Sequence, residues 1–353
     1  MSAPRPLEPL RFQRQFLEKP WGGRSLERVL GLALPPGKIG ETWELVDRDR
    51  ENSVVAEGAF QGRTLRELLR EHGDALLGRA RRSPAGEFPV LVKFLDARED
   101  LSVQVHPHDD HAAELARGDA PKTECWYVLD ATPESVLYHG LKPGVDAATF
   151  AARASGPGVL ELLERHTVRA GDFVFVPGGT VHAIGAGIAL AEVQQTSDTT
   201  YRLYDWGRVD DRGRPRAMHV DAGLRVIRFG VTAPRPVHPT TVERGRGVRA
   251  VELVDAPAFA VELVELDAGA EFALDALGRA RIHVVLAGRG ALRWREAADA
   301  RASASARATP AVIGAMRSCE LAPGDTWLVP ASLGEHVIEA REPLRLLVVR
   351  TQE

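Results

Sequence analysis

The stretch VRAGDFVFVP, from Val168 to Pro177, decides the fold, because LAPGDTWLVP, from Leu321 to Pro330, resembles it. A strand ending in Val-Leu precedes each copy: Trp126–Leu129 upstream of the first and His283–Leu286 upstream of the second. A Gly-Asp turn followed by a short run of large apolar residues is typical of a β-strand. This internal similarity predicts one β-barrel module that is used twice.

Most other apolar segments are also short and end at Gly, Pro or Asp, which favours strands. Helical patterns are few. A capping box at Thr64–Glu67 opens an apolar stripe, and short helices are expected over Asp109–Arg117 and over Ala147–Arg165. The Ala/Arg/Ser-rich segment Ala298–Pro310 is expected to form an exposed, mobile hairpin loop. The fold is therefore predicted to be mainly β, with a few helices covering the sheets.

Composition and length limit the classes of protein to which the chain can belong. The 353 residues suggest two domains or one large one, and the Pro-rich stretch Val231–Thr241 suggests a boundary between residues 1–235 and 236–353. The net charge of -4 gives no support for a nucleic-acid partner. Neither a secretory signal nor an apolar run long enough to cross a membrane is visible. Two cysteines far apart, Cys125 and Cys319, favour a reducing compartment, so we expect a cytoplasmic protein.

Three segments supply candidate metal ligands. Side chains alternate between the faces of a strand, so LSVQVHPHDDH, which starts at Leu101, places Gln104 and His106 on one face. KTECWYVL contributes Glu124, and VFVPGGTVHAIG contributes His182 just after a tight Pro-Gly-Gly turn. Two histidines, a glutamate and a glutamine converging from three β segments predict a site for a divalent metal.

Each of these residues also has a plainer interpretation. His106 could be an ordinary strand histidine. Glu124 could simply form an ion pair with Lys122, which lies on the same strand face, without binding a metal. However, polar groups on a buried face need partners, and a metal would supply one. We expect His108 and His111 to face solvent or to lie behind the ligands. Cys125 points to the opposite face from Glu124 and is expected in the core.

The second copy of the module lacks this constellation. Matching the two Val-Leu strands places Arg281 opposite Glu124, and His336 falls one residue away from the counterpart of His182. We therefore expect the C-terminal module to be structural and to bind no metal.

A polar strand follows the third ligand segment. In EVQQTSDTTYRLYDWGR, the alternation places Thr200, Arg202, Tyr204 and Trp206 on one face. That face could simply be solvated, but a fixed guanidinium near a metal suits an anionic substrate. No glycine-rich phosphate loop is present, so a phosphate would have to be bound by Arg and Lys side chains and by loop amides.

At this point the chain resembles the type I mannose-6-phosphate isomerases, a cupin family. The blocks that carry the resemblance are EKPWGG, GETWEL, LVKFLDAREDLSVQVHP, KTECWYVL and PGGTVHAIGAGIALAEVQQTSDTTYRLYDWGR. It implies two cupin-type (jelly-roll) β-barrel modules with a few covering helices. Residues 1–235 would form the catalytic metal-binding module, and residues 236–353 a degenerate cupin module without a metal site.

The resemblance also implies the chemistry. One Zn²⁺ per chain, or another divalent metal, would be held by His106, Glu124 and His182, with Gln104 as a further ligand. Arg202 and Lys122 would be catalytic. The substrate would be a sugar phosphate, and mannose 6-phosphate and fructose 6-phosphate would interconvert through a cis-enediolate.

Several alternatives stay open at this stage. Glu192, Asp198, Lys122 and a metal-bound water are all candidates for the catalytic base. A cupin dioxygenase and a non-catalytic sugar-binding or storage bicupin are the rival classes of protein. We expect a monomer, with a homodimer as the alternative.

Overall fold

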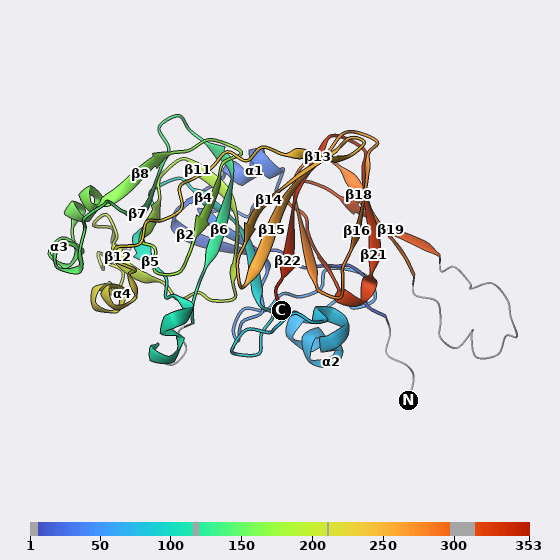
Figure 1. Ribbon diagram of the computed structural model, residues 1–353, viewed down its shortest axis with the longest axis horizontal. Coiled ribbons are helices and arrows are strands. Elements are labelled where there is room, and N and C mark those ends of the chain that lie inside the picture. The colour runs from blue at the N-terminus through green and yellow to red at the C-terminus, as the bar shows by residue number, and fades with distance from the viewer. Residues whose placement is uncertain (1–5, 116–119, 210–211, 297–314) are drawn as a thin grey trace, which may run out of the picture. The chain divides into compact units, whose positions relative to one another are not determined.

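Strands dominate the computed structural model, which describes residues 6–115, 120–209, 212–296 and 315–353 (Figure 1). The mainly β prediction is therefore confirmed. The chain divides into two compact units. The N-terminal unit comprises Arg14–Glu51 and Glu87–Pro239. The C-terminal unit comprises the chain up to Gln13, Asn52–Gly86 and Thr240–Glu353. The expected assignment of residues 1–235 and 236–353 to a catalytic and a degenerate module stays a prediction.

Two antiparallel sheets form the N-terminal unit and share an apolar core. The six-stranded sheet has the order β2 (Gln15–Gly23), β3 (Ile39–Leu45), β4 (Val90–Ala97), β11 (Ile188–Gln195), β6 (Glu124–Ala131) and β9 (Phe173–Val176). The five-stranded sheet has the order β12 (Tyr201–Tyr204), β5 (Val103–Val105), β10 (His182–Ile184), β7 (Val136–Leu141) and β8 (Leu163–Thr167). In Figure 1, β4, β11 and β6 lie side by side in the middle of this unit.

The C-terminal unit repeats this plan of two antiparallel sheets around one core. Its seven-stranded sheet has the order β1 (Leu10–Arg11), β20 (Thr326–Val329), β17 (Arg281–Ala287), β22 (Leu344–Thr351), β15 (Phe259–Leu266), β14 (Val248–Asp255) and β13 (Val242–Gly245). The four-stranded sheet has the order β16 (Glu271–Asp275), β21 (Glu335–Ala340), β18 (Gly290–Arg295) and β19 (Met316–Leu321).

Helices are short and few in the described part of the chain. They are α1 (Ser25–Leu30), α2 (Leu65–Leu77), α3 (Ala147–Ala151), α4 (Val220–Val226) and the 3₁₀ turns η1 (Asp109–Glu114), η2 (Pro157–Leu162) and η3 (Ala331–Leu333). The capping box of α2 is confirmed: the Thr64 hydroxyl accepts the Glu67 N–H at 3.2 Å, and the Glu67 carboxylate accepts the Thr64 N–H at 2.9 Å. None of the described helices is long and apolar enough to cross a membrane.

Two of the helix predictions need correction or restriction. The helical interpretation of Ala147–Arg165 holds only as far as η2, because β8 begins at Leu163 and pairs with β7. After the buried Leu163, its side chains alternate between half-buried and exposed, which is a strand period. The helix expected over Asp109–Arg117 is present as η1, although residues 116 and 117 lie outside the described residues. The loop expected at Ala298–Pro310 lies outside them as well.

Strand register supports the internal repeat. Glu124 on β6 pairs with Val176 on β9, and Arg281 on β17 pairs with Val329 on β20. Val176 and Val329 are themselves equivalent in the repeated stretch. Arg281 therefore occupies the place in the C-terminal unit that Glu124 occupies in the N-terminal unit.

Two rows of paired residues cross the sheets of the N-terminal unit. In the six-stranded sheet, Glu192 on β11 pairs with Lys93 on β4 on one side and with Trp126 on β6 on the other. In the five-stranded sheet, Gln104 on β5 pairs with Arg202 on β12 and with His182 on β10. Four polar residues of these rows line the cavity described next, namely Lys93, Glu192, Gln104 and Arg202.

Candidate metal centre and active site

Three predicted ligands meet inside the N-terminal unit. His106, Glu124 and His182 place a potential ligand atom from each within 4.8 Å of one another. Glu124 approaches both imidazoles, with Oε1 3.5 Å from His182 Nε2 and Oε2 3.5 Å from His106 Nε2. All three side chains are at most 1% exposed. Two imidazole nitrogens and a carboxylate at this spacing can hold a divalent metal ion.

Backbone carbonyls fix both histidines in the form that binds metal. His106 Nδ1 donates to the Thr199 carbonyl at 2.8 Å, and His182 Nδ1 donates to the Thr180 carbonyl at 2.9 Å. With the proton on Nδ1, the Nε2 lone pair of each ring is directed at the centre of the cluster. Burial lowers the pKa of both imidazoles, that of His182 to about 3, so both rings stay neutral. The residues present therefore fit a metal ion.

The predicted glycine turn holds the third candidate ligand in place. Gly179 has a φ of 85°, and its N–H donates to the His106 carbonyl at 2.7 Å. A Cβ on Gly178 would lie 2.6 Å from the Pro107 carbonyl oxygen. Only glycines allow the two ligand segments to approach this closely.

Gln104 and Lys122 border the cluster. Gln104 Nε2 lies 3.2 Å from His182 Nε2, so its amide is within reach of the ion position. Amide oxygen and nitrogen are interchangeable on a simple flip, which would direct Oε1 at a metal. Lys122 Nζ lies 2.5 Å from Glu124 Oε2 and 3.3 Å from His106 Nε2. Burial alone would raise the pKa of Glu124, but the Lys122 ammonium and then His106 hold it well below its ordinary value.

A chain of alternating charges leads away from the cluster along the six-stranded sheet. Lys122 Nζ lies 3.4 Å from Glu192 Oε1, which is 3.1 Å from Lys93 Nζ, and Lys93 in turn lies 3.9 Å from Glu41 Oε1. The four residues are at most 7% exposed. Burial, and after it the charge of Glu124, raises the pKa of Glu192 above its ordinary value. Glu192 is thus a buried carboxylate with two cationic neighbours.

Cationic side chains lie on the opposite side of the cavity. Arg202 donates from Nη1 to the Ala217 carbonyl at 2.9 Å. Burial, and then the charge of Arg216, lowers the pKa of Arg202. Arg216 is held by two hydrogen bonds to the Asp205 carboxylate, one of them 2.7 Å long. Because Arg202 and Arg216 carry two positive charges and Asp205 only one negative charge, this side is positively charged, which suits an anionic group.

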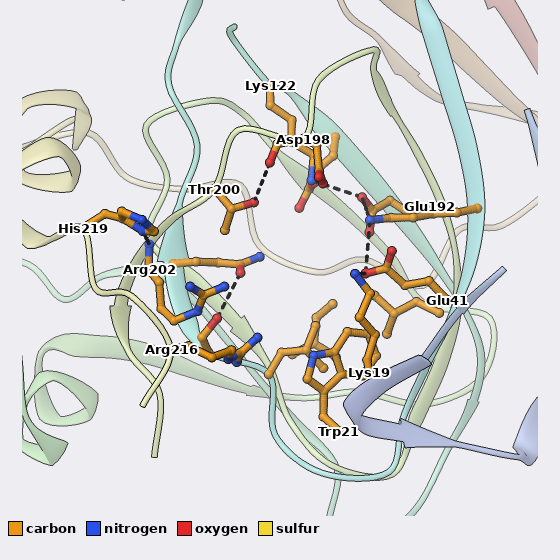
Figure 2. Close-up of a pocket in the computed structure, with 17 residues that line it drawn as sticks. Lys19, Trp21, Glu41, Lys122, Glu192, Asp198, Thr200, Arg202, Arg216 and His219 are labelled. Carbon is orange, nitrogen blue, oxygen red and sulfur yellow. Dashed lines mark hydrogen bonds and ion pairs between the residues drawn. The ribbon is translucent and has the colours of Figure 1, made fainter. Parts of the chain in front are cut away.

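The chain of alternating charges and the cationic side chains opposite it border one cavity of about 240 Å³. Figure 2 shows Arg202, Arg216 and His219 across the opening from Lys19, Glu41 and Glu192, with Lys122 and Asp198 at a third side. Four of the six predicted site residues line it, namely Gln104, Lys122, Glu124 and Arg202, while His106 and His182 lie buried beside Glu124.

Several lining residues carry no role predicted from the sequence, and these are Lys19, Trp21, Glu41, Lys93, Arg216 and His219. For two of these residues, the sequence contains a pattern that could have predicted a buried site. Glu41 and Lys93 are charged residues inside the otherwise apolar segments GETWEL and FPVLVKFLDA, as Glu124 is in KTECWYVL. Buried charges need partners, so the same argument applies to all three.

The remaining candidates lie outside the cluster. His108 Nε2 is 3.1 Å from Arg228 Nη1, and neither His108 nor His111 belongs to the ligand group. Cys125 is buried in the apolar core, as expected. Asp198 lines the cavity, but its side chain is 55% exposed and lies 3.3 Å from Arg48 Nη1.

The fold and the site define the class of protein: a mainly β enzyme with a centre that could hold a metal ion and a charged cavity beside it. Residues 10–134 match the family "Phosphomannose isomerase type I, catalytic domain". The chain is 40% identical to the mannose-6-phosphate isomerase of Streptococcus mutans, over 72% of this chain and 78% of that protein. It is 41% identical to ManA of Bacillus subtilis, a mannose-6-phosphate isomerase, over 67% and 73%. The chain belongs to the type I phosphomannose isomerase family.

Solved structures agree with this membership. The crystal structure of the mannose 6-phosphate isomerase from Bacillus subtilis has a TM-score of 0.81 and 29% identity, covering 97% of this chain and 99% of that one. A phosphomannose isomerase from Salmonella typhimurium has a TM-score of 0.74 at 16% identity, covering 98% and 100%, which supports the fold alone.

Proposed function

We propose that this enzyme interconverts mannose 6-phosphate and fructose 6-phosphate at a zinc ion, through a cis-enediolate. The observation that carries the proposal is the His106–Glu124–His182 cluster, with its fixed imidazole tautomers, at the edge of a cavity with a cationic side. Gln104 is proposed as the fourth ligand, and manganese, cobalt or iron would also suit these donors. When bound, the ion supplies Lewis acidity for the developing negative charge on the sugar oxygens.

The chain's own residues supply binding and proton transfer in this proposal. The reaction removes a proton from C2 of the open-chain aldose and delivers a proton to C1. Arg202, fixed through the Ala217 carbonyl, would stabilise the enediolate or bind the phosphate. Lys122 would counter the negative charge next to the ligands, where its ammonium already contacts Glu124.

Glu192 is the candidate base that the surroundings favour over Asp198. It is 2% exposed, borders the cavity, and has a pKa raised by burial, all of which suit a group that accepts a proton near neutral pH. Asp198 also lines the cavity, but its side chain is 55% exposed to solvent. A Glu192→Gln variant that keeps its turnover would exclude this role.

The decisive experiment measures turnover of mannose 6-phosphate before and after treatment with a chelator. Activity lost on chelation and restored by zinc supports the substrate, the reaction and the metal together. An inactive metal-loaded protein would refute the isomerase proposal, and oxygen consumption with iron or copper would favour the dioxygenase class instead.

Arg202→Ala separates the catalytic role from metal binding. Turnover should fall by orders of magnitude while the metal content, measured by mass spectrometry, stays at one per chain. Arg228→Ala, which changes an arginine that does not line this cavity, is the matched control. A loss of metal in Arg202→Ala would mean that the assigned role is wrong.

We also propose that the enzyme acts as a cytoplasmic monomer. Both cysteines are free, with Cys125 buried and Cys319 partly buried, which is consistent with a reducing compartment. Light scattering of the purified protein would distinguish a monomer from a homodimer.

A further inference from the structure

A second buried polar cluster lies inside the C-terminal unit, at the place that matches the metal centre. Arg281 occupies the register position of Glu124, as shown by its pairing with Val329. His283, two residues along the same strand face, contacts His336 on β21 of the facing sheet, with their Nε2 atoms 3.1 Å apart. A guanidinium therefore replaces a metal carboxylate, and the charge at this place is inverted.

Arg281 is a buried cation without a direct ion-pair partner among the described residues. The residue is 7% exposed, and its guanidinium makes no hydrogen bond or ion pair with any residue that the structure describes. The two carboxylates whose charge acts on Arg281 are Glu262 and Asp275, and both have other partners. Glu262 Oε1 lies 3.8 Å from Arg244 Nη2, and Asp275 accepts the N–H of Leu277 at 2.8 Å.

The neighbouring histidines do not compensate this charge. His336 Nδ1 donates to the Gly334 carbonyl at 3.1 Å, so its Nε2 must accept the proton of His283 Nε2. His283 Nδ1 is then a buried acceptor without a partner among the described residues. Burial lowers the pKa of both imidazoles, so both rings are neutral. Arg281 is left as the charged group of this cluster.

An unpaired guanidinium in the interior of a protein is strongly unfavourable unless an anion or water reaches it. We propose that Arg281 is the centre of a binding site for a small oxyanion, a carboxylate or a phosphate-type ion, within the C-terminal unit. The planar fork of donors on a guanidinium matches the two oxygens that such an anion presents. Because the side chain keeps some exposure, an ion from solution can reach it.

The test compares thermal unfolding of the full-length wild type and of Arg281→Met in rising concentrations of inorganic phosphate and, separately, of acetate at constant ionic strength. Above the dissociation constant, the wild type should gain about 2 °C in melting temperature for each tenfold increase of the free anion concentration. Arg281→Met should lose this gain. Without added oxyanion it should melt no lower than the wild type, because the unpaired charge is gone.

The catalytic cavity also has a cationic side, so Arg202→Met is tested in parallel and should keep the Arg281-dependent gain. A response to phosphate alone or to acetate alone supports the site and identifies the shape of its ligand. Equal anion responses in wild type and Arg281→Met would overturn the proposal. Should Arg281→Met fail to fold, wild-type crystals soaked in arsenate give an independent answer: an anomalous peak beside Arg281 supports the site, and its absence there refutes it.

Discussion

Replacing His139 with leucine should remove a specific part of the acid sensitivity of this protein. His139 on β7 pairs with His182 on β10, is 1% exposed, and has no hydrogen-bond partner on either ring nitrogen among the described residues. Burial, and after it the neighbouring His166, lowers the pKa of His139 from 6.5 to about 4. The folded protein thus keeps this ring neutral at a pH where the unfolded chain protonates it.

The sign and size of the effect follow from this difference. Because the folded pKa is depressed, the stability contribution is complete above about pH 6.5 and is lost as the pH falls towards 4. Each pH unit in that window is worth about 1.4 kcal/mol per histidine. Between pH 6.5 and 5, His139 alone should therefore lower the free energy of unfolding by about 2 kcal/mol.

The assay is urea unfolding of the metal-free protein at pH 7.5 and at pH 5. The loss of unfolding free energy between the two should be about 2 kcal/mol smaller in His139→Leu than in the wild type. His166→Leu, a change in the half-buried neighbouring imidazole on β8, is the matched control. Equal losses in the wild type and in His139→Leu would refute the reasoning.

Three further predictions concern the metal centre, the cavity and the fold. Glu124→Gln removes the only negative charge of the ligand cluster and should lower zinc affinity at least 100-fold, measured by competition with a chromophoric chelator; unchanged affinity would exclude Glu124 as a ligand. Asp205→Asn releases Arg216 from its carboxylate and should raise the KM for mannose 6-phosphate more than it lowers kcat, which steady-state kinetics would show. Thr64→Ala removes the cap of α2 and should lower the free energy of urea unfolding by about 1 kcal/mol with turnover unchanged; a stability equal to that of wild type would contradict the capping assignment.

Local patterns predicted much of this structure from sequence. Alternation along single strands placed Gln104 with His106 and Lys122 with Glu124, because the period of two in a strand is a local property. The repeat identified Arg281 as the counterpart of Glu124, since both strands keep the same register to their neighbours.

The lining residues that the sequence did not predict depend on contacts between distant segments. Glu41 and Arg216 line the cavity from segments that are remote in sequence. The hydrophobic periodicity of one segment does not indicate which loop will lie beside which sheet edge. The helix predicted up to Arg165 is wrong from Leu163 onwards for a related reason. β8 is a strand because β7 offers it a pairing edge, and tertiary pairing overrides local propensity.

The pairing of Glu192 with Lys93 on β4 and with Trp126 on β6 has a consequence for assembly of the sheet. A slip of β11 by one residue would turn Glu192 to the other face and present Ala191 or Val193 to Lys93 instead. Lys93 would then be buried without its carboxylate, at a penalty that an apolar row would not impose. The buried charges that line the cavity therefore also favour the native register of β11 over one that is shifted by a residue.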